Sequence, residues 1–169
     1  MNNIKDCEIC ELIDDVNPVV KTKHWLGYVK PNQAYLGQCD FFLKRHVGDL
    51  ALISNEELID FKNLVKAVET AMKSAFSASM FNWTCLMNNA YQDNPPHPHV
   101  HWHLKPRYDQ PVEFNGIEFT DDEYGYHYDE SKDFVADAAT IQQIHNAISE
   151  DLHQYFPLRI FNKTKRAKI

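Results

Sequence analysis

The chain has 169 residues, of which 44% are hydrophobic and 12% aromatic, and its formal net charge is -7. This length and composition predict one globular domain over residues 1–169 that is large enough to bury a core. The acidic balance argues against binding of nucleic-acid polymers, because affinity for the phosphate backbone comes mainly from clustered Lys and Arg. No stretch approaches the roughly eighteen apolar residues of a membrane span or the apolar core of a signal peptide, so we expect a cytoplasmic protein.

The first motif along the chain is a pair of cysteines at the spacing Cys7-x-x-Cys10. Such a pair supplies half of a tetrahedral zinc site, and the other two ligands must come from elsewhere in the chain. His46 and His99 are the candidates, with His97 as a competitor for one position. Two free thiols without a metal are the plain alternative.

Two strands and a long helix follow. Residues 24–30 and 39–44 are predicted to form an antiparallel hairpin, because both are apolar and the stretch between them contains Pro31, Asn32 and Gly37. Ser54 and Glu57 have the spacing of a capping box. The apolar residues that follow as far as Phe76 repeat with helical period and predict the most secure helix of the chain.

The second half of the chain is predicted to alternate ordered and irregular segments. Residues 81–87 and 100–105 are expected to be strands, separated by an Asn- and Pro-rich loop over 88–98. Residues 106–133 look irregular and acidic, and a second helix is expected from Val135 to Tyr155. The fold class is therefore α+β, with an antiparallel sheet of about five strands, a long helix after the second strand and an added C-terminal helix.

The most informative segment alternates histidine with other residues: His97, His99, His101 and His103. A strand turns successive side chains to opposite faces, so this spacing predicts one face of imidazoles and one face that packs. Folding alone gives no reason to gather several bases that titrate near neutral pH. We therefore predict a catalytic or metal-ligating strand, the alternatives being a His-rich metal tract or a solvated edge.

The run His99-Val100-His101-Trp102-His103-Leu104-Lys105-Pro106-Arg107 resembles the signature of the histidine triad family of nucleotide hydrolases and transferases, His-φ-His-φ-His-φ-φ with φ mostly apolar. The likeness extends over about residues 7–107, through the cysteine pair and Leu43-Lys44-Arg45-His46, and looks most like a bacterial branch with a zinc knuckle. Residues 108–169 have no clear counterpart in the minimal family domain. They comprise the acidic segment, the C-terminal helix and a basic tail.

The resemblance implies a zinc ion held by four protein ligands. By position these are Cys7, Cys10, His46 and His99. Four protein ligands leave no open coordination position, so the zinc would be structural rather than catalytic.

The resemblance also implies the catalytic roles. His101 would be the nucleophile that attacks the α-phosphorus of a nucleotide, and His103 would contact the phosphoryl oxygens and stabilise charge in the transition state. Asn88 matches a position where relatives carry Asn or Gln, and its amide could reach the phosphate. Asn32 and Gln38 are weaker candidates for substrate contact.

Three positions depart from the family pattern. Relatives carry Gly-Gln-Ser or Gly-Gln-Thr before the triad, where this chain has Asn94-Pro95-Pro96. Lys30 stands where relatives have the Asp or Asn that binds ribose, although a two-residue slip would supply Asn32. Gln38 stands where many relatives have a histidine.

The leading expectation is a homodimeric cytoplasmic enzyme that acts on a nucleoside phosphoramidate, phosphosulfate or dinucleoside polyphosphate through a nucleotidyl-His101 intermediate. A nucleotide sensor of the same fold that binds without turnover is the first alternative. An enzyme whose histidines hold a catalytic metal is the second.

Overall fold

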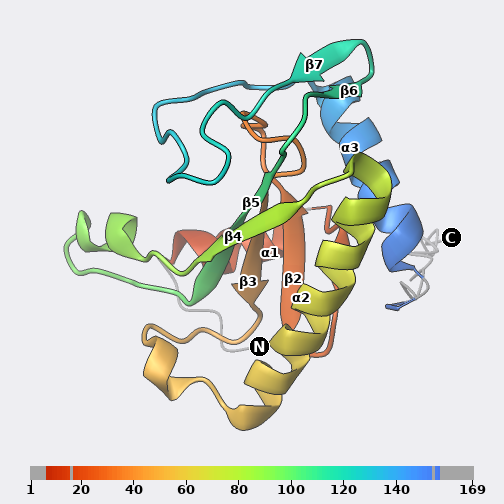
Figure 1. Cartoon of the computed structure of the whole chain (residues 1–169). Coiled ribbons are helices and arrows are strands. Elements are labelled where there is room, and N and C mark those ends of the chain that lie inside the picture. The colour runs from red at the N-terminus through yellow and green to blue at the C-terminus, as the bar shows by residue number, and fades with distance from the viewer. Residues whose placement is uncertain (1–6, 16, 154, 157–169) are drawn as a thin grey trace, which may run out of the picture.

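A five-stranded antiparallel sheet forms the centre of the molecule (Figure 1), with strand order β1-β2-β3-β5-β4. The computed structural model describes residues 7–15, 17–153 and 155–156. The strands are β1 Val20–Lys21, β2 Trp25–Val29, β3 Cys39–Leu43, β4 Met80–Thr84 and β5 His101–Arg107. The predicted fold class is confirmed, but the two-residue β1 was not anticipated and places the long helix after the third strand.

In the described part of the chain, three α-helices accompany the sheet: α1 Glu8–Asp15, α2 Asn55–Phe76 and α3 Ala138–Leu152. The same residues include two short 3-10 helices in the connections, η1 Leu50–Leu52 and η2 Asn88–Tyr91. The capping box predicted for α2 is present, since the Ser54 hydroxyl accepts from the Glu57 amide while the Glu57 carboxylate accepts from the Ser54 amide. Within the described residues, no helix combines the length and hydropathy needed to cross a membrane.

Several predicted boundaries are wrong. The strand expected over 81–87 ends at Thr84, and the histidine strand begins at His101 rather than at residue 100. The last helix starts at Ala138 because the Asp137 carboxylate accepts from the Thr140 amide and caps it there. Val135 lies before the helix and is 66% exposed. The predicted basic tail, 159–168, lies outside the described residues.

The acidic segment contains a small hairpin where irregular chain was expected. It pairs β6 Val112–Phe114 with β7 Ile117–Phe119. The two turn residues, Asn115 and Gly116, both have positive φ, of 56° and 73°. This is the backbone of a tight hairpin turn, and Asn-Gly is the residue pair that adopts it most readily.

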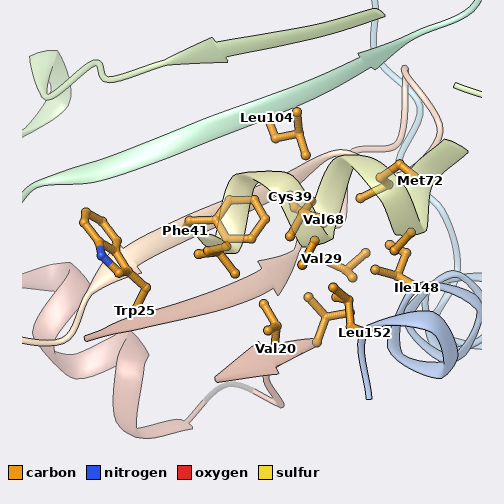
Figure 2. Packing of buried hydrophobic residues seen from close by; sticks show 14 of the residues in the cluster. Val20, Trp25, Val29, Cys39, Phe41, Val68, Met72, Leu104, Ile148 and Leu152 are labelled. Carbon is orange, nitrogen blue, oxygen red and sulfur yellow. The ribbon is translucent and has the colours of Figure 1, made fainter. Parts of the chain in front are cut away.

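One face of the sheet is packed against α2 and α3. Figure 2 shows side chains of the sheet meeting those of the two helices, among them Phe41 of β3, Leu104 of β5, Val68 of α2 and Ile148 of α3. All four are at most 1% exposed. Because alternate strand residues point the same way, Trp102 and Leu104 lie on this face and the intervening histidines face the opposite side.

The opposite face of the sheet carries α1. Ile13 of this helix packs with Leu26 of β2 and Phe42 of β3 in a separate small cluster. The eight residues of α1 are too few to cover the whole face. The part of this face that lies over β3 and β5 is therefore left for a cavity.

Arg107, the last residue of β5, anchors the acidic segment to the sheet. Its side chain is fully buried and makes a two-pronged ion pair with Asp121, with contacts of 2.6 and 2.8 Å. The remaining guanidinium bonds go to Asn82 and to the carbonyls of Glu123 and Tyr126. The next residue, Tyr108, donates its hydroxyl proton to the Leu36 carbonyl at 2.6 Å. The chain beyond the family-like core is thus built into the fold by buried polar contacts.

Candidate functional site

A cavity of about 450 Å³ opens on the α1 side of the sheet. Ile9 and Leu12 of α1 form one wall, the sheet forms the floor, and residues 86–90 together with Asp93 form the opposite wall. All four histidines of the alternating run line it, although only His101 and His103 lie on β5. The alternation continues before the strand because Val100 still exchanges backbone hydrogen bonds with Val47 and Leu43.

His101 is held with one ring nitrogen available for chemistry. Its Nδ1 lies 2.8 Å from the carbonyl oxygen of His99, which can only accept, so Nδ1 carries a proton. In the neutral ring the lone pair is then on Nε2. Burial lowers the pKa of His101, and the hydrogen bond to the His99 carbonyl opposes this shift only in part. A neutral imidazole with a defined tautomer is what a nucleophilic histidine requires.

His103 lies directly against His101 and against a carboxylate. Its Nε2 is 3.1 Å from Nε2 of His101, and its Nδ1 is 2.7 Å from Oδ1 of Asp40. Asp40 is the cross-strand partner of His103 in the pairing of β3 with β5. Burial raises the pKa of the Asp40 carboxyl, but His103 and the Lys30 ammonium 3.3 Å away outweigh it and lower that pKa overall. Asp40 is therefore a carboxylate at neutral pH.

The four residues predicted to bind zinc come together at one end of the cavity. Sγ of Cys7, Sγ of Cys10, Nδ1 of His46 and Nδ1 of His99 all lie within 4.8 Å of one another. The distances between neighbouring sulfur and nitrogen atoms are 3.4 to 3.5 Å. A sulfur and a nitrogen bound to one tetrahedral zinc ion lie about 3.5 Å apart, given the usual bond lengths. The donor set and its spacing therefore fit zinc.

His99 is oriented toward this cluster by a backbone contact. Its Nε2 lies 2.6 Å from the Leu43 carbonyl, which accepts that proton and leaves Nδ1 as the ligand atom. Burial lowers the pKa of His99 to about 4, so the ring is neutral as a metal ligand must be. Burial raises the pKa of the Cys7 thiol to about 11, and a divalent cation would have to displace that proton on binding.

Replacing Cys7 with serine is expected to weaken zinc binding about 100-fold or more, since even partners outside the ligand set change metal affinity 10- to 100-fold. With zinc in excess, that loss lowers the free energy of unfolding by roughly 2.7 kcal/mol and Tm by about 5–10 °C. Metal content by mass spectrometry and a thermal melt measure both effects. Cys85→Ser is the matched control, because Cys85 lies outside the cluster. A Cys7→Ser protein that keeps its ion at unchanged affinity would contradict the assignment.

Of the remaining predicted site residues, some line the cavity and others lie outside it. Asn88, at the start of η2, lines the cavity. Asn32 does not: its amide donates to Asp133 at 2.6 Å and its oxygen accepts from the Ala34 amide. Gln38 does not line the cavity either. It is 4% exposed, and its amide donates to the Asn32 carbonyl. Lys30 and Asn32 are the two candidates for the position at which relatives bind ribose. Lys30 lines the cavity, whereas Asn32 does not.

Asp40 is a polar residue of this site that sequence reasoning missed and that contacts one of the predicted catalytic histidines. It lies in an apolar strand between Cys39 and Phe41, where nothing local marks it as functional. The signal that could have found it is the alternation of β3, which places Asp40 and Phe42 on the same face as His101 and His103 once the two strands are paired.

No protein-family model matches the chain, and no curated protein is similar to it in sequence. The structure is similar to a histidine triad nucleotide-binding protein from Sulfolobus tokodaii, with a TM-score of 0.63 and 14% identity, over 88% of this chain and 93% of that one. A zinc-bound histidine triad protein from Mycobacterium smegmatis matches with a TM-score of 0.54 and 15% identity, over 86% and 94% of the two chains. The diadenosine triphosphate hydrolase of Plasmodium falciparum matches at 0.57 and 16%, over 82% and 78%. These likenesses show a shared fold.

Proposed function

We propose that this chain, which has the fold of the histidine triad proteins, is a nucleotide hydrolase or transferase that works through a nucleotidyl-His101 intermediate. Its substrate would be a nucleoside phosphoramidate, a phosphosulfate or a dinucleoside polyphosphate. The observation that carries the proposal is the orientation of His101, whose Nδ1 is held by the His99 carbonyl while Nε2 is directed toward His103 in the cavity.

The reaction would have two displacements at the α-phosphorus. In the first, the lone pair on His101 Nε2 forms a bond to phosphorus and the leaving group departs on the opposite side. In the second, water attacks phosphorus and the bonding pair returns to His101. A covalent intermediate of this kind divides one difficult displacement into two easier ones. Asn88, across the cavity, would contact the phosphate through its amide.

The rest of the cavity suits a nucleoside. Ile9 and Leu12 of α1, Phe42 of β3 and Leu86 after β4 supply apolar surface beside the histidines. Ligand sites commonly combine such apolar walls with a few placed polar groups, and about 450 Å³ lies in their usual size range. Zinc at the cysteine and histidine cluster would support this wall, since Cys7 and Cys10 flank Ile9.

The homodimer implied by the family resemblance has a candidate edge. β4 lies at one end of the sheet order and is half-buried along its whole length. An edge strand with unpaired backbone groups is a usual place for a second copy to pair. We propose pairing through β4 as the route to a dimer.

Intact-protein mass spectrometry tests the proposed function. The protein would be mixed briefly with adenosine 5'-phosphoramidate or a dinucleoside polyphosphate and quenched without acid, beside the His101→Gly variant. We expect an adduct of one nucleoside monophosphate on the unmodified chain and none on the variant. Binding of these nucleotides without adduct or product would overturn the proposal and favour a nucleotide sensor.

A further inference from the structure

Four groups in the cavity form one continuous chain of polar contacts. It runs from Asp40 to His103, then to His101, and ends at the His99 carbonyl, with distances of 2.7, 3.1 and 2.8 Å. The two ends of the chain can only accept protons, since one is a carboxylate and the other a carbonyl. Nδ1 of His103 and Nδ1 of His101 must therefore both carry protons.

The contact in the middle of the chain requires one more proton. The two Nε2 atoms are 3.1 Å apart, and two facing lone pairs at that distance would repel each other. One of the two Nε2 atoms must donate, so the pair of rings carries three protons on four nitrogens and one positive charge. The only carboxylate in hydrogen-bond contact with either ring, among the described residues, is Asp40.

We propose that Asp40 is a positioning residue that keeps His103 doubly protonated, so that His103 presents its Nε2–H beside the attacking nitrogen of His101. The inference rests on the proposed function, and it deepens that function by naming Asp40 as the group that stabilises a positive charge on His103. Lys30 holds the second oxygen of the carboxylate, at 3.3 Å, and fixes the carboxylate in this orientation.

The position of His103 beside His101 indicates which substrate atom His103 would contact. Its Nε2 lies beside the attacking atom, whereas the leaving group departs on the far side of phosphorus. The Nε2–H therefore turns from His101 to a non-bridging phosphoryl oxygen when substrate enters, which frees the His101 lone pair. His103 keeps its Nε2 proton throughout both displacements. In the first displacement, the departing amine or oxygen takes any proton it needs from water. In the second, the attacking water releases its proton to solvent. A cation beside the phosphoryl oxygens stabilises the charge spread over them in the transition state.

The first test of this proposal does not depend on activity. In zinc-loaded protein with ¹⁵N-labelled histidine, the ring nitrogen shifts report which nitrogens carry protons, and a His103→Gln variant identifies the signals. At pH 7 we expect both nitrogens of His103 to be protonated in the unmodified chain and one of them to lose its proton in Asp40→Asn. The other titratable groups that line the same cavity are His101 on β5, Lys30 after β2, Cys7 and Glu8 at the start of the described chain, and Asp93, His97 and His99 on the segment before β5. A His103 ring with only one protonated nitrogen at pH 7 in the unmodified chain would overturn the proposal.

The second test is kinetic. Asp40→Asn has nearly the same shape as the native residue but no charge, and we expect kcat to fall about 100-fold while KM changes less than about threefold, as for loss of one preorganised electrostatic contact. Asp40→Glu should recover part of kcat, and Lys30→Met should cost less than Asp40→Asn because the carboxylate remains. A kcat for Asp40→Asn within threefold of the unmodified value would refute the role. Absence of turnover in the unmodified chain would instead refute the proposed function, and the NMR result would then decide the role of Asp40 alone.

Discussion

His101→Ala is expected to lower kcat by at least about 10⁴-fold, because the substitution removes the atom that forms the bond to phosphorus. Nucleotide affinity should change little, since the apolar walls and Asn88 remain in place. The fold should also be retained: His101 lies on the cavity side of β5, and its own hydrogen bonds go to His103 and to the neighbouring His99 carbonyl. Single-turnover kinetics together with a binding titration would separate the loss of chemistry from a loss of binding.

A matched control for this variant exists elsewhere in the chain. His127 is exposed and lies outside the cavity, and among the described residues its ring bonds only to the adjacent Tyr128 carbonyl. His127→Ala should therefore keep kcat within about twofold of the unmodified chain, since isolated surface substitutions have small effects. A His101→Ala protein with comparable turnover would refute nucleophilic catalysis by His101, whatever product is formed.

Arg107→Met is expected to lower the free energy of unfolding by about 3–5 kcal/mol. The substitution leaves Asp121, whose side chain is 1% exposed, as an unpaired buried carboxylate, and breaking a buried ion pair on one side has a cost of this size. It also removes the donors to Asn82, Glu123 and Tyr126. For a chain of this length the corresponding fall in Tm is roughly 6–20 °C. Urea denaturation and a thermal melt measure the two quantities.

The double variant Arg107→Met with Asp121→Leu distinguishes the loss of the ion pair from a general disruption of packing. Replacing both charges by apolar side chains removes the stranded carboxylate, and such replacements are often neutral or stabilising. We therefore expect the double variant to recover a large part of the lost stability. Equal instability of the single and double variants would show that the carbonyl contacts of Arg107, rather than its pairing with Asp121, hold the acidic segment.

Local sequence patterns were sufficient for the elements that depend on near neighbours in the chain. The capping box at Ser54 and the helical repeat after it predicted α2, because a helix is built from contacts between residues three and four apart. The alternation in the histidine run placed His101 and His103 on the side of β5 away from the core. The Asn115-Gly116 pair is also typical of a hairpin turn. The short strands that it joins were not predicted, because the segment around it is acidic and irregular in pattern.

The sequence by itself determined the long helix α2, the last helix α3 and the strands β2 to β5, apart from some of their boundaries, and it contained the cysteine pair and the histidine run. The short strands β1, β6 and β7 were not predicted. Only the tertiary structure decided which distant groups meet: Asp40 faces His103 across 63 positions of chain, whereas Asn32 and Gln38 are turned away from the cavity. The physical reason is that the register between two strands is set when the whole sheet packs, and a one-residue slip would move every side chain to the other face. Periodicity along one strand carries no information about its partner's register, so the charge on His103 could be inferred only after β3 and β5 were seen paired.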